Sequence, residues 1–311
     1  MSGKLLTNPI PVTDSHQPDP NQRTFKLTLA YDGTGFHGWQ VQPGLPTIQG
    51  ELQAALGRIT GESPLPQGSG RTDAGVHALA QVVSFPLQAN IPSQNLMRAL
   101  NGTLPPAIRV LESRTVASSF HARHSAVAKT YEYRVFREAV CPPFLARYVL
   151  SCSWLLDIEA MRRSARLFEG RHDFLSFAAT DPDLASRTSE PDWKPGQELR
   201  APMPPPQTPK PQTPEPQTME PQTVRTVFSS IWEECHGEAG GLLVYRIRGN
   251  GFLHHMVRNL VGTMLEVGRG NFNCEDIPRI LAARSRSAAG PTAPAQGLFL
   301  HSVAYDELES N

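Results

Sequence analysis

An arginine and an aspartate stand two positions apart in the stretch SGRTDAGVHA, residues 69–78, as Arg71 and Asp73. A carboxylate can act as a nucleophile or as a base, and a nearby guanidinium can keep it ionised. Gly75 permits the tight turn that would present the Asp73 carboxylate to a cleft. Solvated surfaces also carry such pairs, so this stretch alone leaves a catalytic loop and an ordinary surface turn both open.

Two alternative chemistries lack the partner residues that they require. The turn at residues 73–75 is similar to the Asp-Ser/Thr-Gly turn of aspartic proteases, but their second carboxylate turn is absent from the other half of the chain. The neighbours Cys235 and His236, or His254 and His255, could suggest a metal, but no HExxH motif or paired CxxC accompanies them. We therefore expect no metal site, and we expect His254 and His255 to face a polar cleft or an RNA backbone.

A third alternative is a dinucleotide site, because the glycines of YDGTGFHGW, residues 31–39, have the GxGxxG spacing. Pro43 and Pro46 interrupt the helix that should follow and hold the pyrophosphate at its N-terminus. This disfavours a nicotinamide oxidoreductase. We expect a tight polar turn instead, with Trp39 either packed or exposed for stacking.

Two further side chains are candidates for a binding site. Tyr131 and Tyr133 alternate on one face of an expected strand, where either could pack in the core or lie flat against a base. Arg258 lies within a mostly apolar helical pattern, where an unpaired charge is costly. We therefore expect Arg258 to have a carboxylate or phosphate partner.

The elements that must position these residues alternate between strand and helix patterns. In the first half, TFKLTLAY places apolar residues from Phe25 to Tyr31 on one strand face, and helical spacing follows from Ile48 to Ile59. The strand QVVSF, a helix after Ser93 and the strand AIRVLESRTV complete this half.

The second half has a similar organisation. TYEYRVF is an expected strand, Asp157 is the expected cap of a helix, and the strands TVFSSIW and LLVYRIR precede the helix HHMVRNLVGTMLEVG. These patterns predict an α+β fold with two similar lobes, at residues 24–125 and 126–308. Each lobe should contain a mainly antiparallel sheet flanked by helices, with a catalytic cleft between the lobes.

Composition is typical of a soluble globular protein, with 39% hydrophobic and 19% charged residues in 311. The polar tail at residues 1–23 has no signal-peptide core, and no apolar run approaches the ~20 residues that would cross a membrane, so we expect a cytoplasmic location. Residues 191–223 repeat Pro-Gln-Thr with a period of five and should form an extended insertion in the second lobe. The four cysteines lack CxxC spacing and should be buried or idle thiols.

Formal charge balances at 29 basic and 29 acidic residues, but the distribution is uneven. Residues 121–171 contain nine Lys/Arg against five Asp/Glu, and residues 242–290 contain seven against three. A neutral protein can therefore carry a basic groove for a polyanion, although solvated helix faces would also account for these counts.

Three motifs in this order, GRTDAGVHALAQV, FHARHSAVAKTYEYRV and FLHHMVRNLVGTMLEVGRG, resemble the tRNA pseudouridine synthase A (TruA) family. The resemblance runs from about Phe25 to Tyr305, including YDGTGFHGWQ and QGLFLHSVAY, and is interrupted by the proline-rich insertion. It implies the pseudouridine synthase fold. It also implies an isomerase that breaks the N1–C1′ bond of a uridine in tRNA and joins C5 to C1′, without cofactor or metal.

The resemblance also implies a role for each candidate residue. Asp73 is the catalytic carboxylate, acting as a nucleophile or as a base. Arg71 and Arg258 flank it electrostatically and help to extrude the target nucleotide, Tyr131 stacks under the uracil and assists proton removal from C5, and Leu298 lines the uracil pocket.

The implied substrates are uridines of the tRNA anticodon stem-loop, at about positions 38, 39 and 40, held by the joint basic surface of a homodimer. A non-catalytic RNA-binding protein of the same fold remains the alternative, which the presence of Asp73, Tyr131 and Arg258 disfavours. The role of the insertion at residues 191–223 stays open.

Overall fold

The computed structural model describes residues 22–179, 222–237 and 240–306. The predicted tail at residues 1–23 and the predicted insertion at 191–223 lie almost wholly outside the described residues. None of the described helices is long and apolar enough to cross a membrane.

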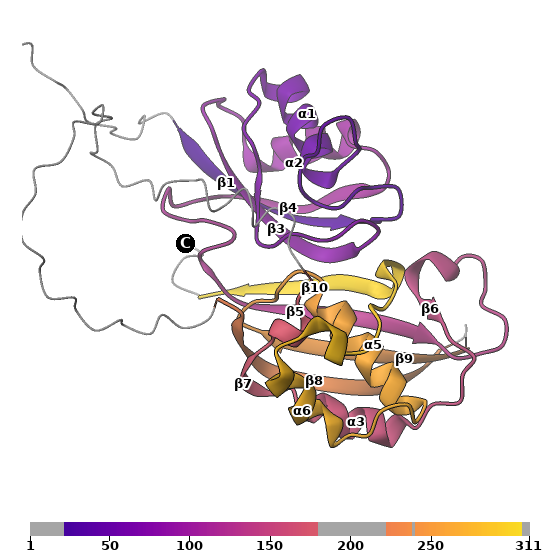
Figure 1. Ribbon diagram of the computed structural model, residues 1–311. Helices are drawn as coiled ribbons and strands as arrows, with labels where there is room; N and C mark the ends of the chain where they lie inside the picture. Colours follow the sequence, from indigo (N-terminus) through magenta and orange to yellow (C-terminus); the bar gives the residue numbers. More distant parts are fainter. Residues whose placement is uncertain (1–21, 180–221, 238–239, 307–311) are drawn as a thin grey trace, which may run out of the picture.

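Ten strands form one mixed sheet in the order β4-β1-β3-β10-β5-β9-β8-β7, with β2 beside β3 and β6 beside β5 (Figure 1). Neighbouring strands are antiparallel except for the pairs β10/β3 and β5/β6. The strands are β1 Arg23–Tyr31, β2 Gln67–Gly68, β3 His77–Leu87, β4 Ile108–Val116, β5 Ala126–Phe136, β6 Leu150–Ser151, β7 Gly170–Asp173, β8 Val224–Gly237, β9 Gly240–Gly249 and β10 Leu298–Tyr305. The mainly antiparallel α+β fold that the sequence predicts is confirmed.

The described α-helices occur where the sequence patterns place them, together with a short helix late in the chain. Asp157 accepts a hydrogen bond from the backbone N–H of Ala160 and so caps its helix, as predicted. The helices are α1 Ile48–Thr60, α2 Ser93–Thr103, α3 Ile158–Arg166, α5 Met256–Gly268 and α6 Asp276–Ala283.

The C-terminal strand β10 joins the two halves of the chain. Phe299 and Leu300 pair in parallel with His77 and Ala78 of β3, and the other edge of β10 pairs with β5 along its length. Figure 1 shows β10 in yellow between the indigo and purple strands of the first half and the strands of the second half. The sheet and the apolar core therefore run continuously through both halves, and the division into two lobes at residues 125 and 126 remains a prediction.

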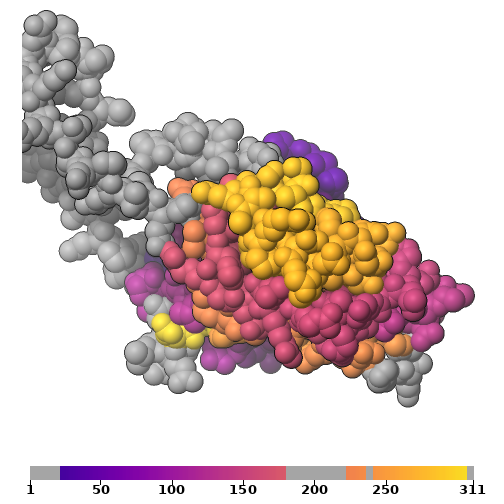
Figure 2. Space-filling model, turned by 60° about the horizontal axis from the view of Figure 1, so that its bottom comes forward, coloured from indigo at the N-terminus to yellow at the C-terminus, as the bar shows by residue number. Residues whose placement is uncertain are grey.

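Helices α1 and α2 pack on the first half of the sheet, and α3, α5 and α6 lie on the second half (Figure 1). On the face in Figure 2, the gold segment that contains α6 lies beside the rose segment that contains α3 and β7. Helix α5 is the central helix of the second half, because nearly all of its side chains are buried. A methyl group on its Gly262 would lie 1.7 Å from the carbonyl oxygen of Pro291, so this glycine permits the close approach of the segment before β10.

Candidate active site

Asp73 lies in the turn that connects β2 to β3. The backbone N–H of Val76 donates to the carbonyl oxygen of Asp73 at 3.1 Å, and Gly75 between them has a φ of +77°. That left-handed conformation favours glycine and closes the turn that the sequence predicts. The turn leaves 18% of the Asp73 side chain exposed, so the carboxylate can reach a bound molecule.

Two of the three glycines of the GxGxxG spacing, Gly33 and Gly38, hold this turn in place by close backbone contact. A methyl group on Gly33 would lie 2.0 Å from the carbonyl oxygen of Val76, and one on Gly38 would lie 2.6 Å from that of Thr72. Trp39 donates its backbone N–H to Thr72 at 3.0 Å, and its side chain is buried. These glycines therefore position the Asp73 turn, and Trp39 is a packing residue and is not exposed for stacking.

Arg258 on α5 forms an ion pair with Asp73, and only 15% of its side chain is exposed. Its Nη1 donates to Oδ2 of Asp73 at 3.0 Å. Its Nε donates to the carbonyl oxygen of Ala293 at 2.8 Å, and the Ala293 N–H returns a bond to the Arg258 carbonyl. The bond to Ala293 thus holds the guanidinium so that it points at the carboxylate. Asp73 is the carboxylate partner that the sequence predicts for a charge in this apolar helix.

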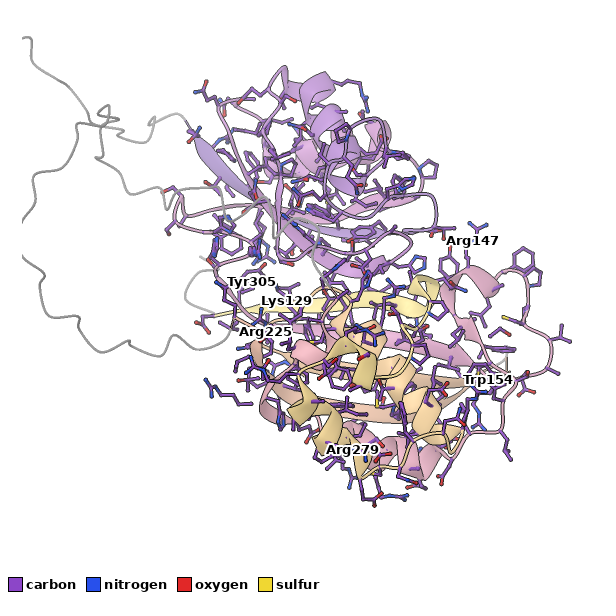
Figure 3. The ribbon with its side chains drawn as sticks, viewed as in Figure 1. Lys129, Arg147, Trp154, Arg225, Arg279 and Tyr305 are labelled. Atoms are coloured by element: carbon purple, nitrogen blue, oxygen red, sulfur yellow. The ribbon has the colours of Figure 1, made fainter. Side chains whose placement is uncertain are left out.

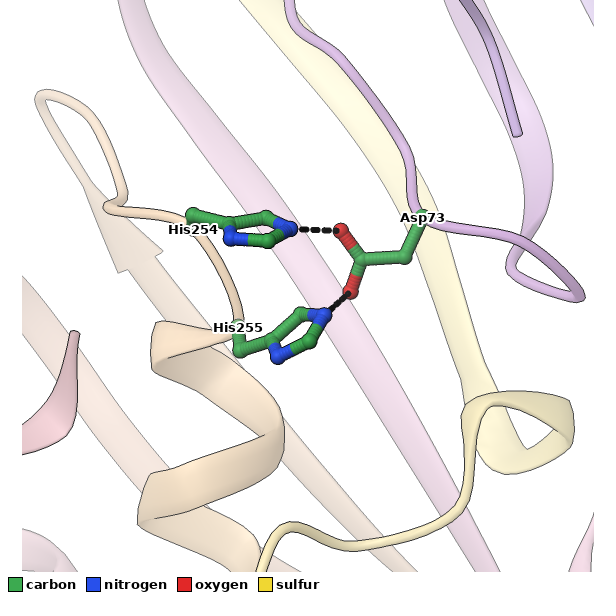
Figure 4. Close-up of side chains that lie close together, drawn as sticks. All are labelled: Asp73, His254 and His255. Atoms are coloured by element: carbon green, nitrogen blue, oxygen red, sulfur yellow. Dashed lines mark ion pairs between the residues drawn. The ribbon is translucent and has the colours of Figure 1, made fainter. Parts of the chain in front are cut away.

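Two histidines face the same carboxylate from the start of α5 (Figure 4). Nε2 of His254 lies 3.6 Å from Oδ1 of Asp73, and Nε2 of His255 lies 3.4 Å from Oδ2. His255 has a φ of +58°, and the two imidazole centroids are 3.9 Å apart. Burial lowers the pKa of His255, and the charge of Asp73 only partly offsets this, so the ring is neutral near pH 7.

The ligand atoms of Asp73, His254 and His255 lie within 4.8 Å of one another, a spacing that a metal ion could bridge. The positive guanidinium of Arg258 already occupies Oδ2 of Asp73 and would oppose a cation there. The geometry fits a carboxylate paired with a guanidinium better than it fits a metal centre.

The turn and the start of α5 face a cavity of about 1130 Å³. All five candidate residues of the sequence analysis contribute to this site: Arg71, Asp73, Tyr131 and Leu298 line the cavity, and Arg258 reaches it through its ion pair. Leu298 is the first residue of β10, opposite Tyr133 of β5.

Tyr131 lies on β5 in the wall of the cavity, with 7% of the residue exposed. Its ring meets that of Phe252 edge to face, with centroids 5.1 Å apart. Burial raises the pKa of Tyr131, and the nearby Tyr31 and Asp73 raise it further. Tyr131 is therefore a neutral phenol, suited to apolar contact with a base or to donating a hydrogen bond. Proton removal by this side chain would first require an unfavourable phenolate.

A buried histidine supports the turn from the first strand that follows it. Nδ1 of His77 accepts from the Gly33 N–H at 3.0 Å, and its Nε2 lies 3.1 Å from the carbonyl oxygen of Arg147. The ring therefore carries its proton on Nε2 and is neutral. Burial lowers the pKa of His77 although Asp32 lies 3.2 Å from Nδ1. We accordingly interpret the contact with Asp32 as a polar contact and not as an ion pair.

The sequence analysis missed three residues that line the cavity beside Tyr131, namely Lys129, Arg225 and Phe252. Lys129 precedes Tyr131 by two positions on the same strand. Side chains two positions apart on a strand lie on one face, so the sequence could have predicted that Lys129 lies beside Tyr131. Arg225 lies directly after residues of the predicted insertion, and no pattern connects it to the site.

Comparisons with known proteins agree with this fold. A family model described as tRNA pseudouridine synthase matches residues 28–125 and 212–306, more than half of the chain. The tRNA pseudouridine synthase A of Solibacter usitatus is 48% identical over 283 residues, which are 91% of this chain and all of the relative. Those of Moorella thermoacetica and Bacillus pumilus are 41% and 39% identical, each over 90% of this chain and 98% of the relative.

The α+β fold and these matches together place the chain in a class of RNA-modifying isomerases. The chain belongs to the tRNA pseudouridine synthase family. The resemblance noted in the sequence is confirmed over most of the chain.

Proposed function

We propose that this protein converts uridine to pseudouridine in the anticodon stem-loop of tRNA, at about positions 38, 39 and 40, with Asp73 as the catalytic carboxylate. The observation that carries the proposal is the 3.0 Å contact between Arg258 and Asp73 at the cavity. It orients one carboxylate toward the cavity in a chain of this family.

The reaction is an isomerisation and needs no co-reactant. The N1–C1′ bond of the uridine breaks, the uracil turns while it is held, and C5 bonds to C1′. The proton on C5 then leaves, and N1 gains a proton. Asp73 assists either by adding to the ribose or the base or by removing a proton from the sugar, and both routes balance without a metal or a redox cofactor.

The other candidate residues hold the nucleotide. A uridine must leave its stack to reach Asp73, and Arg71 helps to extrude it. Tyr131 presents its ring to the uracil, and Leu298 gives the pocket an apolar wall. Arg258 stays bonded to Asp73 and holds its carboxylate in place. A non-catalytic RNA-binding protein would have no use for a carboxylate oriented in this way at the cavity.

The assembly is part of the proposal. Two copies of the chain would combine their basic segments, residues 121–171 and 242–290, into one surface for the tRNA. Each copy would contribute the lobes at residues 24–125 and 126–308. Binding should weaken steeply with salt, because the arginines displace counterions from phosphates.

The test is a reaction of the purified protein with an unmodified tRNA transcript that has uridines at the three proposed positions, without added metal or nucleotide cofactor. Mapping at single-nucleotide resolution should find pseudouridine there, and a transcript with cytidines at these positions should remain unmodified. Modification only outside the anticodon stem-loop would contradict the proposed substrate, and a lack of any modification would contradict the proposed activity.

A further inference from the structure

Three basic side chains gather at one end of the cavity. They are Lys129 on β5, Arg225 on β8 and Arg123 in the segment between β4 and β5. Figure 3 shows Lys129 and Arg225 close together at the same end of the sheet. They line the cavity that contains Asp73, but the chemistry at Asp73 does not account for them.

The Lys129 ammonium lies beside the residues that hold the nucleotide. A methyl group on Gly70 would lie 3.4 Å from Nζ of Lys129 and 3.8 Å from the hydroxyl oxygen of Tyr131. Gly70 belongs to the turn that carries Asp73. Lys129 and Tyr131 share a face of β5, and two residues span about 7 Å along a strand. Nζ of Lys129 and the hydroxyl group of Tyr131 therefore both lie beside Gly70 in this turn.

Two neighbouring positive charges act on this ammonium. Burial, followed by the charges of Arg123 and Arg225, lowers the pKa of Lys129 to about 8. The pKa of Arg225 is also lowered, by burial and by Arg123. On the facing turn, the Asp73 carboxylate is bonded to Arg258. Arg123 and Arg225 therefore make the charged form of Lys129 less favourable, and an anion bound beside Lys129 would favour it.

The RNA backbone supplies an anion of the right chemistry. A phosphodiester carries one negative charge at neutral pH, and its two free oxygens can accept from an ammonium and a guanidinium together. Arg225 already directs Nη1 at the carbonyl oxygens of Gln222 and Val224, which restrains its guanidinium near the cavity. The Arg225 side chain therefore loses little further conformational freedom when a phosphate binds.

We infer that Lys129, together with Arg225 and Arg123, binds the backbone phosphate beside the uridine that enters the cavity, and that Lys129 must be protonated to do so. The inference rests on the proposed function. It makes Lys129 a positioning residue, whose charge contributes to tRNA binding and not to bond cleavage.

Linkage gives this role a pH signature. A free enzyme above about pH 8 has lost the Lys129 proton and must regain it from solvent to bind the phosphate. The tRNA dissociation constant should therefore be level below that pH and should rise above it by about tenfold in all, to the value expected of an enzyme without this charge. We call this rise the alkaline limb. The single-turnover rate at saturating tRNA should not change over the same pH range.

The experiment measures the equilibrium dissociation constant for tRNA between about pH 6 and about pH 9.5, and the single-turnover rate at saturating tRNA, on the same preparations. Lys129→Arg keeps its charge throughout this range, so its affinity should stay level where that of the wild type falls. Lys129→Met should bind roughly tenfold more weakly at neutral pH, with a salt slope smaller by about one and no alkaline limb. Arg98→Met, which removes an exposed charge from α2 outside the cavity, is the control for loss of a positive charge and should follow the wild type.

A wild-type alkaline limb that persists unchanged in Lys129→Arg would overturn the inference, because the titrating group would then lie elsewhere on the protein or on the RNA. So would wild-type affinity in Lys129→Met. A protein that binds tRNA with the expected limb but forms no pseudouridine would contradict the proposed function and leave the phosphate site supported.

Discussion

Arg258 and Asp73 are separated by 185 residues in sequence and by 3.0 Å between Nη1 and Oδ2. The pair connects α5 in the second half of the chain to the β2–β3 turn in the first half. The carboxylate is therefore oriented only when both halves are folded together.

Replacing Arg258 should slow the reaction without abolishing tRNA binding. Loss of a hydrogen bond between charged groups costs roughly 1.5–3 kcal/mol, so Arg258→Ala should reduce the single-turnover rate roughly 10- to 100-fold. Arg258→Lys should lie between, because it keeps the charge but loses the bond from Nε to Ala293. If Arg258 instead grips a phosphate, both variants would raise the tRNA dissociation constant and leave the rate at saturation unchanged.

Gly38 should be required for activity because of its contact with the Asp73 turn. A side chain there would meet the Thr72 carbonyl oxygen at 2.6 Å, and the φ of +85° is unfavourable for alanine. Gly38→Ala should therefore displace the turn and reduce the rate roughly 100-fold, since small misplacements of a reacting group are costly.

Gly35→Ala is the matched control, because a methyl group there would have no neighbour within 4 Å. It should keep the wild-type rate and melting temperature. Equal losses of rate in Gly35→Ala and Gly38→Ala would argue against a positioning role for Gly38.

The free energy of unfolding should fall as the pH falls from about 7 to about 5. Burial lowers the pKa of His77 and of His255 in the folded protein, so the unfolded chain binds more protons below the ordinary histidine pKa of about 6.5. Each group contributes at most about 1.4 kcal/mol per pH unit. Urea unfolding at several pH values measures this slope.

His77→Gln should reduce the slope, because the amide can replace both ring hydrogen bonds and does not titrate. His37→Gln, at an exposed position, should leave the slope as in the wild type. An undiminished slope in His77→Gln would show that this histidine does not account for the acid sensitivity.

The elements of the fold could be predicted from local pattern. The apolar alternation from Phe25 to Tyr31 is the buried face of β1, and Asp157 caps α3 as its type and position indicate. Strand partners could not be predicted in this way, because periodicity identifies a strand but not its neighbour. The insertion of β10 between β3 and β5 is such a case.

The candidate site was predicted only in part. Motif resemblance indicated Asp73 and Arg258, whereas residue spacing left several chemistries open. The convergence of His254 and His255 was not expected in detail, because adjacent residues in regular structure point in different directions. The left-handed backbone of His255 brings both rings to one side, and a single sequence gives no signal for that conformation.

The most direct test of the account is the single-turnover rate of pseudouridine formation by Asp73→Asn, measured at saturating tRNA beside the dissociation constant. The amide is nearly isosteric with the carboxylate but can neither attack nor accept a proton as a carboxylate does. We predict that pseudouridine formation is lost while tRNA affinity stays close to that of the wild type, because phosphate contacts come from other residues. A rate near that of the wild type would contradict the assignment of Asp73 as the catalytic carboxylate.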